Sequence, residues 1–174
     1  MKFKLIKLKS VDSTNNYALN LIKKKILFPT IIIAEKQTKG RGRINNKWIS
    51  LKGNIFMSII FEINKKYSLK KITNLNCHFI KHALKKFSKK KIEIKKPNDL
   101  LIEKKKFCGV LQETLFANGK KFIIVGIGIN VFKKPNIKKY ETTNLSHFSR
   151  SKINKQVVYR SIKNCYENNI ERFL

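Results

Sequence analysis

The segment from Lys36 to Lys47 carries the side chains with the clearest chemical potential in this sequence. It is polar except for Ile44, and it contains Gly40-Arg41-Gly42-Arg43. Glycines let a backbone approach a ligand closely, and the planar guanidinium group of arginine matches a carboxylate or a phosphate. A basic run in a lysine-rich protein is often only a solvated turn. Because two of the chain's five arginines stand here, we interpret the segment as an anion-binding loop.

A second glycine-containing segment, residues 126–130, ends an apolar stretch with Asn130. An amide at the mouth of a strand pair can offer both a donor and an acceptor to a base such as adenine. Lys106 opens another apolar stretch, although it is the last of three consecutive lysines and alone would be read as a surface residue. The dinucleotide-binding fingerprint fails because Asn45 replaces its third glycine, and no P-loop motif occurs. ATP would therefore need another architecture.

The other nucleophiles and metal ligands do not assemble into a familiar site. His78 and His82 stand at zinc-ligand spacing, but the glutamate of a metalloprotease is missing, so we interpret them as surface residues of a helix. Ser13 and Ser58 have no evident base. Cys108 lies in a predicted buried strand, where a raised pKa would leave its thiol inert. Only two aspartates and eight glutamates are present, which argues against paired-carboxylate chemistry.

Hydrophobic periodicity predicts the elements that must position these side chains. The predicted strands are Phe3 to Leu8 at a sheet edge, Thr30 to Glu35, Asn54 to Glu62, Ile92 to Lys96, Leu100 to Glu103, Phe107 to Phe116 and Lys121 to Val131. The predicted helices are a segment capped by Asp12 or Ser13, Leu69 to Phe87, and Asn154 to Phe173. Residues 97–99 and 117–120 have the composition of turns. Strands outnumber helices and do not alternate with them, which predicts an α+β fold with a mixed, largely antiparallel β-sheet and helices packed on it.

The length and composition fit one domain, residues 1–174. The chain is 42% hydrophobic, and no repeat or linker divides it. The longest nearly apolar run, Phe122 to Phe132, is eleven residues and too short to cross a bilayer. The N-terminus has no apolar signal segment, so we expect a cytoplasmic protein with no membrane partner. Three widely spaced cysteines predict reduced thiols.

The net charge of +30 raises the question of a nucleic-acid partner. Lysine supplies 35 of the 40 basic residues, and lysine, isoleucine and asparagine all have codons rich in A and T. A codon bias therefore explains the charge without a partner. Arginine is scarce and the aromatic residues lie in apolar runs, so we expect no specific nucleic-acid binding.

Several motifs follow one another in order along nearly the whole chain. They are Asp12-Ser13-Thr14-Asn15, Ala34 to Arg43 with Lys47-Trp48 after it, Lys95 to Asp99, Lys106 to Glu113, and Gly126 to Asn130. Together they resemble the catalytic domain of the biotin protein ligases, and the glycine-arginine loop with its following tryptophan is the most specific of them. The lipoate ligases share that fold, but their loop has a double-arginine, triple-glycine pattern that is missing here.

The resemblance implies a two-step reaction. Biotin and ATP, with Mg²⁺, form biotinyl-5'-adenylate, and a lysine of the biotin carboxyl carrier protein of acetyl-CoA carboxylase then takes the biotinyl group. The catalytic residues it implies are Lys106, Arg41 and Arg43, which would gather the biotin carboxylate and the phosphates. The biotin-binding residues it implies are Ser13, Thr14, Asn15, Gln37, Gly40, Arg41, Gly42, Arg43, Lys106 and Gly109. The ATP-binding residues it implies are Trp48, Asn98, Asp99 and Asn130, with Asp99 orienting the acceptor lysine or the metal.

Two features depart from the family pattern. Lys96 stands where the family has a tryptophan before Pro97. The sequence ends at Leu174, where the family usually continues into a small β-barrel, and it has no N-terminal winged helix. We therefore expect a minimal, monofunctional ligase with no repressor role. A lipoate or octanoate ligase and a nonenzymatic nucleic-acid-binding module remain the alternatives, and the oligomeric state stays open.

Overall fold

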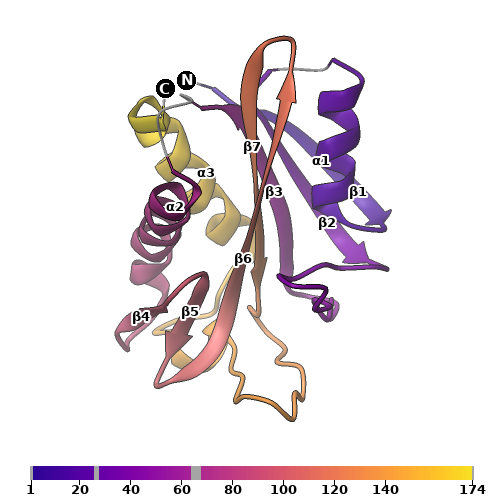
Figure 1. The fold of residues 1–174 in the computed structure, drawn as a ribbon. Coiled ribbons are helices and arrows are strands. Elements are labelled where there is room, and N and C mark those ends of the chain that lie inside the picture. The colour runs from indigo at the N-terminus through magenta and orange to yellow at the C-terminus, as the bar shows by residue number, and fades with distance from the viewer. Residues whose placement is uncertain (1, 26–27, 64–67, 174) are drawn as a thin grey trace.

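A computed structural model describes residues 2–25, 28–63 and 68–173 of the chain. Within them, seven strands form one sheet in the order β1-β2-β3-β7-β6-β5-β4 (Figure 1). The strands are β1 (Lys4–Val11), β2 (Thr30–Gln37), β3 (Ile55–Glu62), β4 (Ile92–Lys95), β5 (Asp99–Ile102), β6 (Lys105–Ala117) and β7 (Lys120–Ile129). β1 and β2 are parallel, and the other neighbouring pairs are antiparallel. The predicted mixed, largely antiparallel sheet is confirmed.

Helices cover both faces of this sheet. α2 (Leu69–Leu84) and α3 (Lys155–Asn169) pack together on one face, and α1 (Thr14–Lys23) lies on the other (Figure 1). The apolar stripe predicted for α1 is buried as expected, with Ala18, Leu21 and Ile22 turned to the sheet. No helix in the described part of the chain is both long enough and apolar enough to span a membrane.

The side chains of β7 differ between the two faces of the sheet. Successive residues of a strand point to opposite sides. Ile123, Val125 and Ile129 belong to the large core beneath α2 and α3, whereas Phe122 and Ile124 pack under α1. On the α1 side the same alternation continues with Gly126 and Gly128, where the large side chains stop. Beyond α1, this face of the sheet therefore has glycines where large side chains would otherwise lie.

Most predicted elements are confirmed, with shifts at their ends. The hairpin turn between β6 and β7 holds Asn118 and Gly119 at positive φ, which the Asn-Gly pair favours. Lys36 and Gln37, predicted as the start of the polar loop, are instead the last two residues of β2, because β1 continues to pair with β2 as far as Val11. Residues 85–87 and 170–173, predicted as α-helix, form 3₁₀ turns.

Candidate active site

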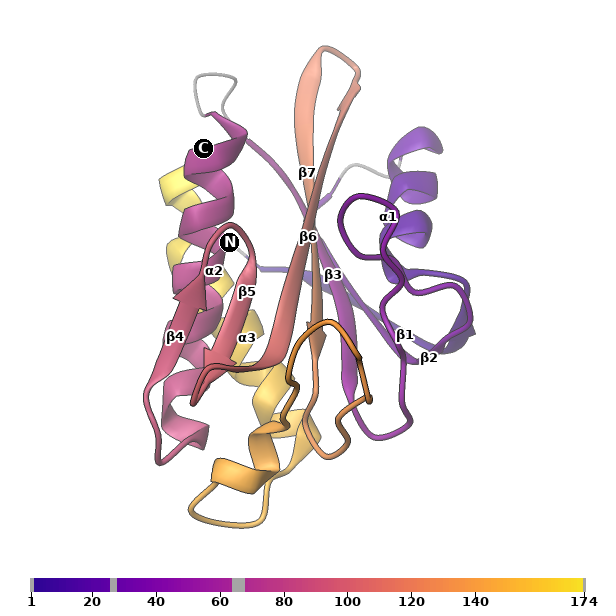
Figure 2. The same ribbon diagram turned by 60° about the horizontal axis from the view of Figure 1, so that its bottom comes forward.

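A cavity of about 740 Å³ opens on the α1 side of the sheet, beyond the N-terminus of that helix. Its walls are the start of α1, the loop after β2, and the segment after β7, which lie at the same end of the sheet in Figure 2. The lining includes residues predicted from the motifs: Ser13, Thr14, Asn15, Gln37, Arg41, Gly42, Arg43, Trp48, Asn98, Asp99, Lys106 and Gly109. Segments far apart in sequence thus meet in one cavity.

Three glycines on adjacent strands form the floor of the cavity. Gly109 of β6 pairs with Gly128 of β7, and Gly126 lies two residues before Gly128. A Cβ on Gly128 would lie 2.4 Å from Cε2 of Trp48, and one on Gly126 would lie 2.3 Å from Oδ1 of Asn15. The floor therefore requires glycine, because the indole and the amide lie directly on the backbone.

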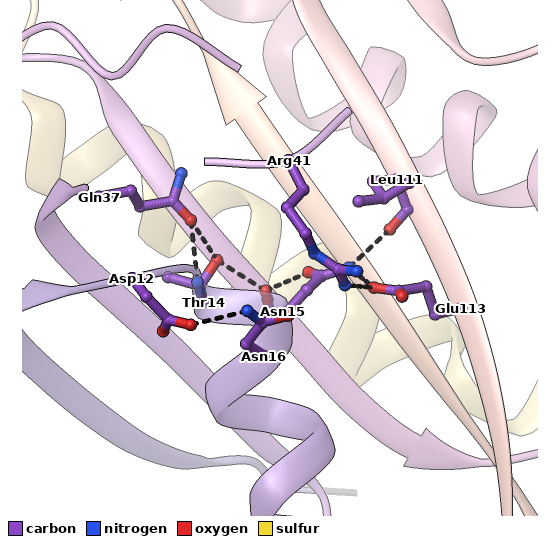
Figure 3. A network of polar contacts seen from close by, with 9 residues as sticks. Asp12, Thr14, Asn15, Asn16, Gln37, Arg41, Leu111 and Glu113 are labelled. Atoms are coloured by element: carbon purple, nitrogen blue, oxygen red, sulfur yellow. Dashed lines mark hydrogen bonds and ion pairs between the residues drawn. The ribbon is translucent and has the colours of Figure 1, made fainter. Parts of the chain in front are cut away.

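A polar network surrounds the start of α1 (Figure 3). The backbone N–H of Thr14 donates to Oε1 of Gln37 over 2.9 Å, and the Thr14 hydroxyl reaches the same oxygen over 3.1 Å. Oγ of Ser58, on β3, lies within hydrogen-bond distance of both Thr14 Oγ1, at 2.8 Å, and Asn15 Oδ1, at 2.5 Å. Ser13, Thr14, Asn15 and Ser58 are all buried. Buried polar groups held this way present fixed donors and acceptors to a ligand.

The glycine-arginine loop is a small hairpin that leans on the sheet. Trp48 N–H donates to the Gly40 carbonyl over 2.9 Å, and Arg41 forms a bridge with Lys47. The Arg41 guanidinium forms an ion pair with Glu113 of β6 (Figure 3). Arg43 Nη1 lies 3.4 Å from Asn98 Oδ1. Both arginines line the cavity, whereas Gly40 lies at the hairpin base, outside the lining.

Lys106 reaches the cavity because of a β-bulge. Along a regular strand, residues three apart point to opposite faces, yet the register between β5 and β6 shifts at Leu100/Leu101 and leaves Phe107 as the extra residue. The shift brings Lys106 to the side of Gly109, where a Cβ on the glycine would lie 3.4 Å from Lys106 Cε. Its ammonium forms a 2.8 Å ion pair with Asp99.

Two aromatic rings flank the same ammonium group. Lys106 Nζ lies 5.7 Å from the ring centroid of Trp48 and 5.1 Å from that of Tyr140, both within cation–π range. Tyr140 is brought there by backbone pairing, because Lys106 N–H donates to the Glu141 carbonyl and Thr143 N–H donates to the Lys106 carbonyl. The segment after β7 is thereby tied to the strand that carries Lys106.

Asn130 lies behind this cavity and not in its lining. It borders a small adjoining pocket with Trp48 and Tyr140, and its Nδ2 donates to the Thr143 carbonyl over 3.1 Å. Oδ1 of Asn130 and Nε1 of Trp48 are buried without a hydrogen-bond partner in the described part of the chain. One unpaired acceptor and one unpaired donor are therefore buried beside the same small pocket.

The thiols and histidines stay outside this chemistry, as predicted. Burial raises the pKa of Cys108 well above its ordinary value and that of Cys77 to about 11, so both thiols are held in the neutral form. His78 and His82 are exposed on α2. Among residues 2–25, 28–63 and 68–173, no group of three or more His, Cys, Asp or Glu residues could hold a metal ion.

Sequence analysis assigned no role to three residues of the site. Ser58 sits in an apolar strand, and only the register that places it opposite Gly126 shows its connection to Asn15. Glu113 was noted as part of a motif, and the structure shows its contacts with Asn15 and Arg41. Tyr140 lies in a lysine-rich segment with no periodic signal. Polar residues in apolar strands would have been the available clue.

Comparison with known proteins gives the family to which this fold and cavity belong. Residues 8–130 match the model of the biotin/lipoate A/B protein ligase family, so the chain belongs to that family. It is 33% identical over 166 residues to the bifunctional ligase/repressor BirA of Bacillus subtilis, covering 90% of this chain and 50% of the relative. It is 32% identical over 124 residues to BirA of Escherichia coli, covering 70% of this chain and 38% of the relative.

Solved structures agree with this assignment. The biotin protein ligase of Aquifex aeolicus in complex with biotin and ATP superposes with a TM-score of 0.81 at 30% identity, over 98% of this chain and 71% of that one. A bipartite lipoate protein ligase of Thermoplasma acidophilum shares the fold, with a TM-score of 0.65 at 10% identity. The chain spans about half the length of the Bacillus relative it matches.

Proposed function

We propose that this chain is an ATP-dependent biotin ligase that forms biotinyl-5'-adenylate and transfers the biotinyl group to a lysine of a carrier protein. The observation that supports this most strongly is the convergence of Arg41, Arg43 and Lys106 on one cavity, from a loop and from a bulged strand. Joining two anions requires cations at the junction. Similarity to biotin protein ligases, one of them bound to biotin and ATP, gives the substrates.

In the first step, an oxygen of the biotin carboxylate attacks the α-phosphorus of ATP. A carboxylate–phosphorus bond forms, and the bond from that phosphorus to the bridging oxygen of pyrophosphate breaks. Both reactants are anions, so most of the barrier is positioning and charge repulsion. Lys106, which Asp99 holds at 2.8 Å, would be drawn to the junction, while Arg41 and Arg43 neutralise the carboxylate and the phosphates.

In the second step, the neutral amine of an acceptor lysine attacks the acyl carbon of the adenylate. An amide bond forms, AMP leaves with the electrons of the anhydride bond, and the proton lost by the amine passes to solvent. Asp99 is the carboxylate of the cavity lining, and we assign it the orientation of the incoming amine. The adenylate must be shielded from water until then, which the arginine hairpin and the segment bearing Tyr140 are placed to do.

Biotin recognition is assigned to the polar network at the start of α1. A ureido ring offers two N–H donors and a carbonyl acceptor, and the side chains of Ser13, Thr14, Asn15 and Gln37 line the cavity with both kinds of group. The buried network holds these groups in fixed orientations. We assign Gly109 a floor position beneath the ligand.

The adenine is assigned to the part of the main cavity beside Trp48, with Asn130 behind that ring and Asn98 at the phosphates. The unpaired Nε1 of Trp48 and Oδ1 of Asn130 supply a donor and an acceptor there. Magnesium usually binds one or two carboxylates together with phosphate oxygens and waters, so Asp99 fits as its protein ligand when ATP brings it in. Bound in that way, the ion would neutralise charge on the phosphates.

The experiment that tests this proposal is a transfer assay. The purified chain would be incubated with biotin, ATP, Mg²⁺ and the biotin carboxyl carrier domain of acetyl-CoA carboxylase, and then blotted with streptavidin. We expect labelling that requires ATP and disappears when the acceptor lysine is replaced by arginine. A parallel reaction with lipoate, read by an anti-lipoyl antibody, should stay blank. Labelling by lipoate alone would assign the chain to the lipoate branch of the family.

A further inference from the structure

Glu113 joins the two halves of the cavity wall. It lies on β6, on the side of the sheet that faces α1, since it pairs with Ile124 and so stands in the same alternation as Gly109. Its Oε2 accepts from Asn15 Nδ2 over 2.7 Å and forms the ion pair with Arg41 (Figure 3). One carboxylate therefore holds the start of α1 and the arginine hairpin together.

Part of the Arg41 guanidinium has no hydrogen-bond partner in the described part of the chain. Nη2 meets Glu113, whereas Nε is buried with no hydrogen-bond partner in the described part of the chain. Arginine has five donors in a rigid fork, so a carboxylate that fixes one edge orients the remaining donors. Arg41 lines the cavity and its side chain is 37% exposed, so the part of the guanidinium that is not buried lies within reach of a ligand anion.

We infer that Glu113 is a positioning residue that pre-organises Arg41 and Asn15 for the acyl-adenylate. This inference rests on the proposed function and adds to it. Glu113 is outside the cavity lining and acts through its two partners. A mobile arginine side chain loses conformational entropy when it binds an anion. An arginine that is already held in place loses less entropy and so binds the anion more favourably. The opposite model, in which Glu113 competes with the ligand for Arg41, predicts that removing its charge improves binding.

The test compares the variants Glu113→Gln, Arg41→Ala and the double variant in the adenylation half-reaction. Glutamine keeps an acceptor oxygen for Asn15 and loses the charge that holds Arg41. We expect kcat/KM to fall about 10-fold in Glu113→Gln, in the range of one charge-assisted hydrogen bond. The double variant should be no worse than Arg41→Ala, because Glu113 acts through that arginine. Glu62→Gln is the matched control. It removes the charge of a β3 residue that pairs with Lys120 at the protein surface, and it should keep wild-type kinetics.

A second readout needs no activity. The five arginines allow limited digestion with an arginine-specific protease. Cleavage after Arg41 and Arg43 should accelerate several-fold in Glu113→Gln, while cleavage after the exposed Arg150 stays constant. Unchanged loop cleavage, additive losses in the double variant, or a gain in kcat/KM would each overturn the inference. The wild-type chain could form no adenylate while loop cleavage changes as expected in the variant. That result would contradict the proposed function but would still show that Glu113 holds the loop in place.

Discussion

The two faces of the central sheet are built from the same strands, but one face forms the apolar core and the other forms the cavity. Toward α2 and α3, β7 presents Ile123, Val125 and Ile129 to a large apolar core. Toward α1, the same strand presents Phe122 and Ile124 and then changes to Gly126 and Gly128. The change from large side chains to glycine falls beyond the N-terminus of α1, where the cavity begins.

The difference shows how a site is made within a stable sheet. On the core face, the free energy comes from buried area at about 25 cal/mol per Å². On the site face, side chains are removed and their space is taken by Trp48 and Asn15, which lie on the glycines. Replacements on the two faces should therefore separate stability from catalysis, and the following experiments are ordered by the expected size of their effect.

The largest effect is expected for Lys106→Ala. The lysine would neutralise charge that develops between carboxylate and phosphate, so its loss should reduce the rate of adenylation by about 100-fold to 1,000-fold. Biotin affinity should change far less, because that contact strengthens at the transition state. Single-turnover adenylation and biotin titration measure the two quantities. Lys105→Ala is the matched control, because Lys105 pairs with exposed Glu141. Equal losses of rate and affinity would show that Lys106 only binds substrate.

A methyl group on the cavity floor should have the next largest effect. In Gly128→Ala, the new Cβ would lie 2.4 Å from Trp48 Cε2, so the indole must shift. A displacement of about 1 Å at a positioned site costs on the order of 100-fold in kcat/KM. Because the chain has one tryptophan, its fluorescence reports the shift directly. An unchanged emission spectrum with unchanged activity would show that the floor tolerates a side chain.

The sequence predicted the strands, the helices and the motif residues because periodicity and local composition encode them. It did not predict that Lys106 and Gly109 share a side, since that depends on the bulge at Phe107. Nor did it predict the partners of Arg41 and Ser58, which depend on how distant strands pair. Arg41, Arg43 and Lys106 line the same cavity, whereas Gly40 and Asn130 lie outside that lining.

On the opposite face, Ile123→Ala should lower the stability of the protein and leave its activity nearly unchanged. Ile123 is fully buried beneath α2 and α3, so its truncation should lower the free energy of unfolding by about 2–5 kcal/mol. Adenylation by the fraction that remains folded should stay within about 3-fold of wild type, because the cavity floor is untouched. Urea denaturation and kinetics at low temperature measure both effects. A loss of activity without a loss of stability would contradict the separation of the two faces.

The smallest effect concerns Glu167 of α3. Burial raises its pKa, but the hydrogen bonds from Lys163 and from the Phe3 backbone outweigh burial, and the net pKa lies below the ordinary 4.5. A lowered folded-state pKa stabilises the protein above pH 4.5, and that contribution is lost as the pH falls through the folded-state value. Glu167→Gln should therefore be less stable than wild type at pH 7 by about 1 kcal/mol. The gap should shrink as acid denaturation is approached; a constant gap would contradict the assignment.

The central claim is that the glycine-floored cavity joins a biotin carboxylate to the α-phosphate of ATP. Its most direct test is incubation of the purified chain with ATP labelled at the α-phosphate, with and without biotin, followed by chromatographic separation of biotinyl-5'-adenylate. We predict a biotin-dependent adenylate, formed with wild-type chain and nearly absent with Lys106→Ala. A folded wild-type chain that forms no adenylate, or forms it with lipoate and not with biotin, would contradict the account.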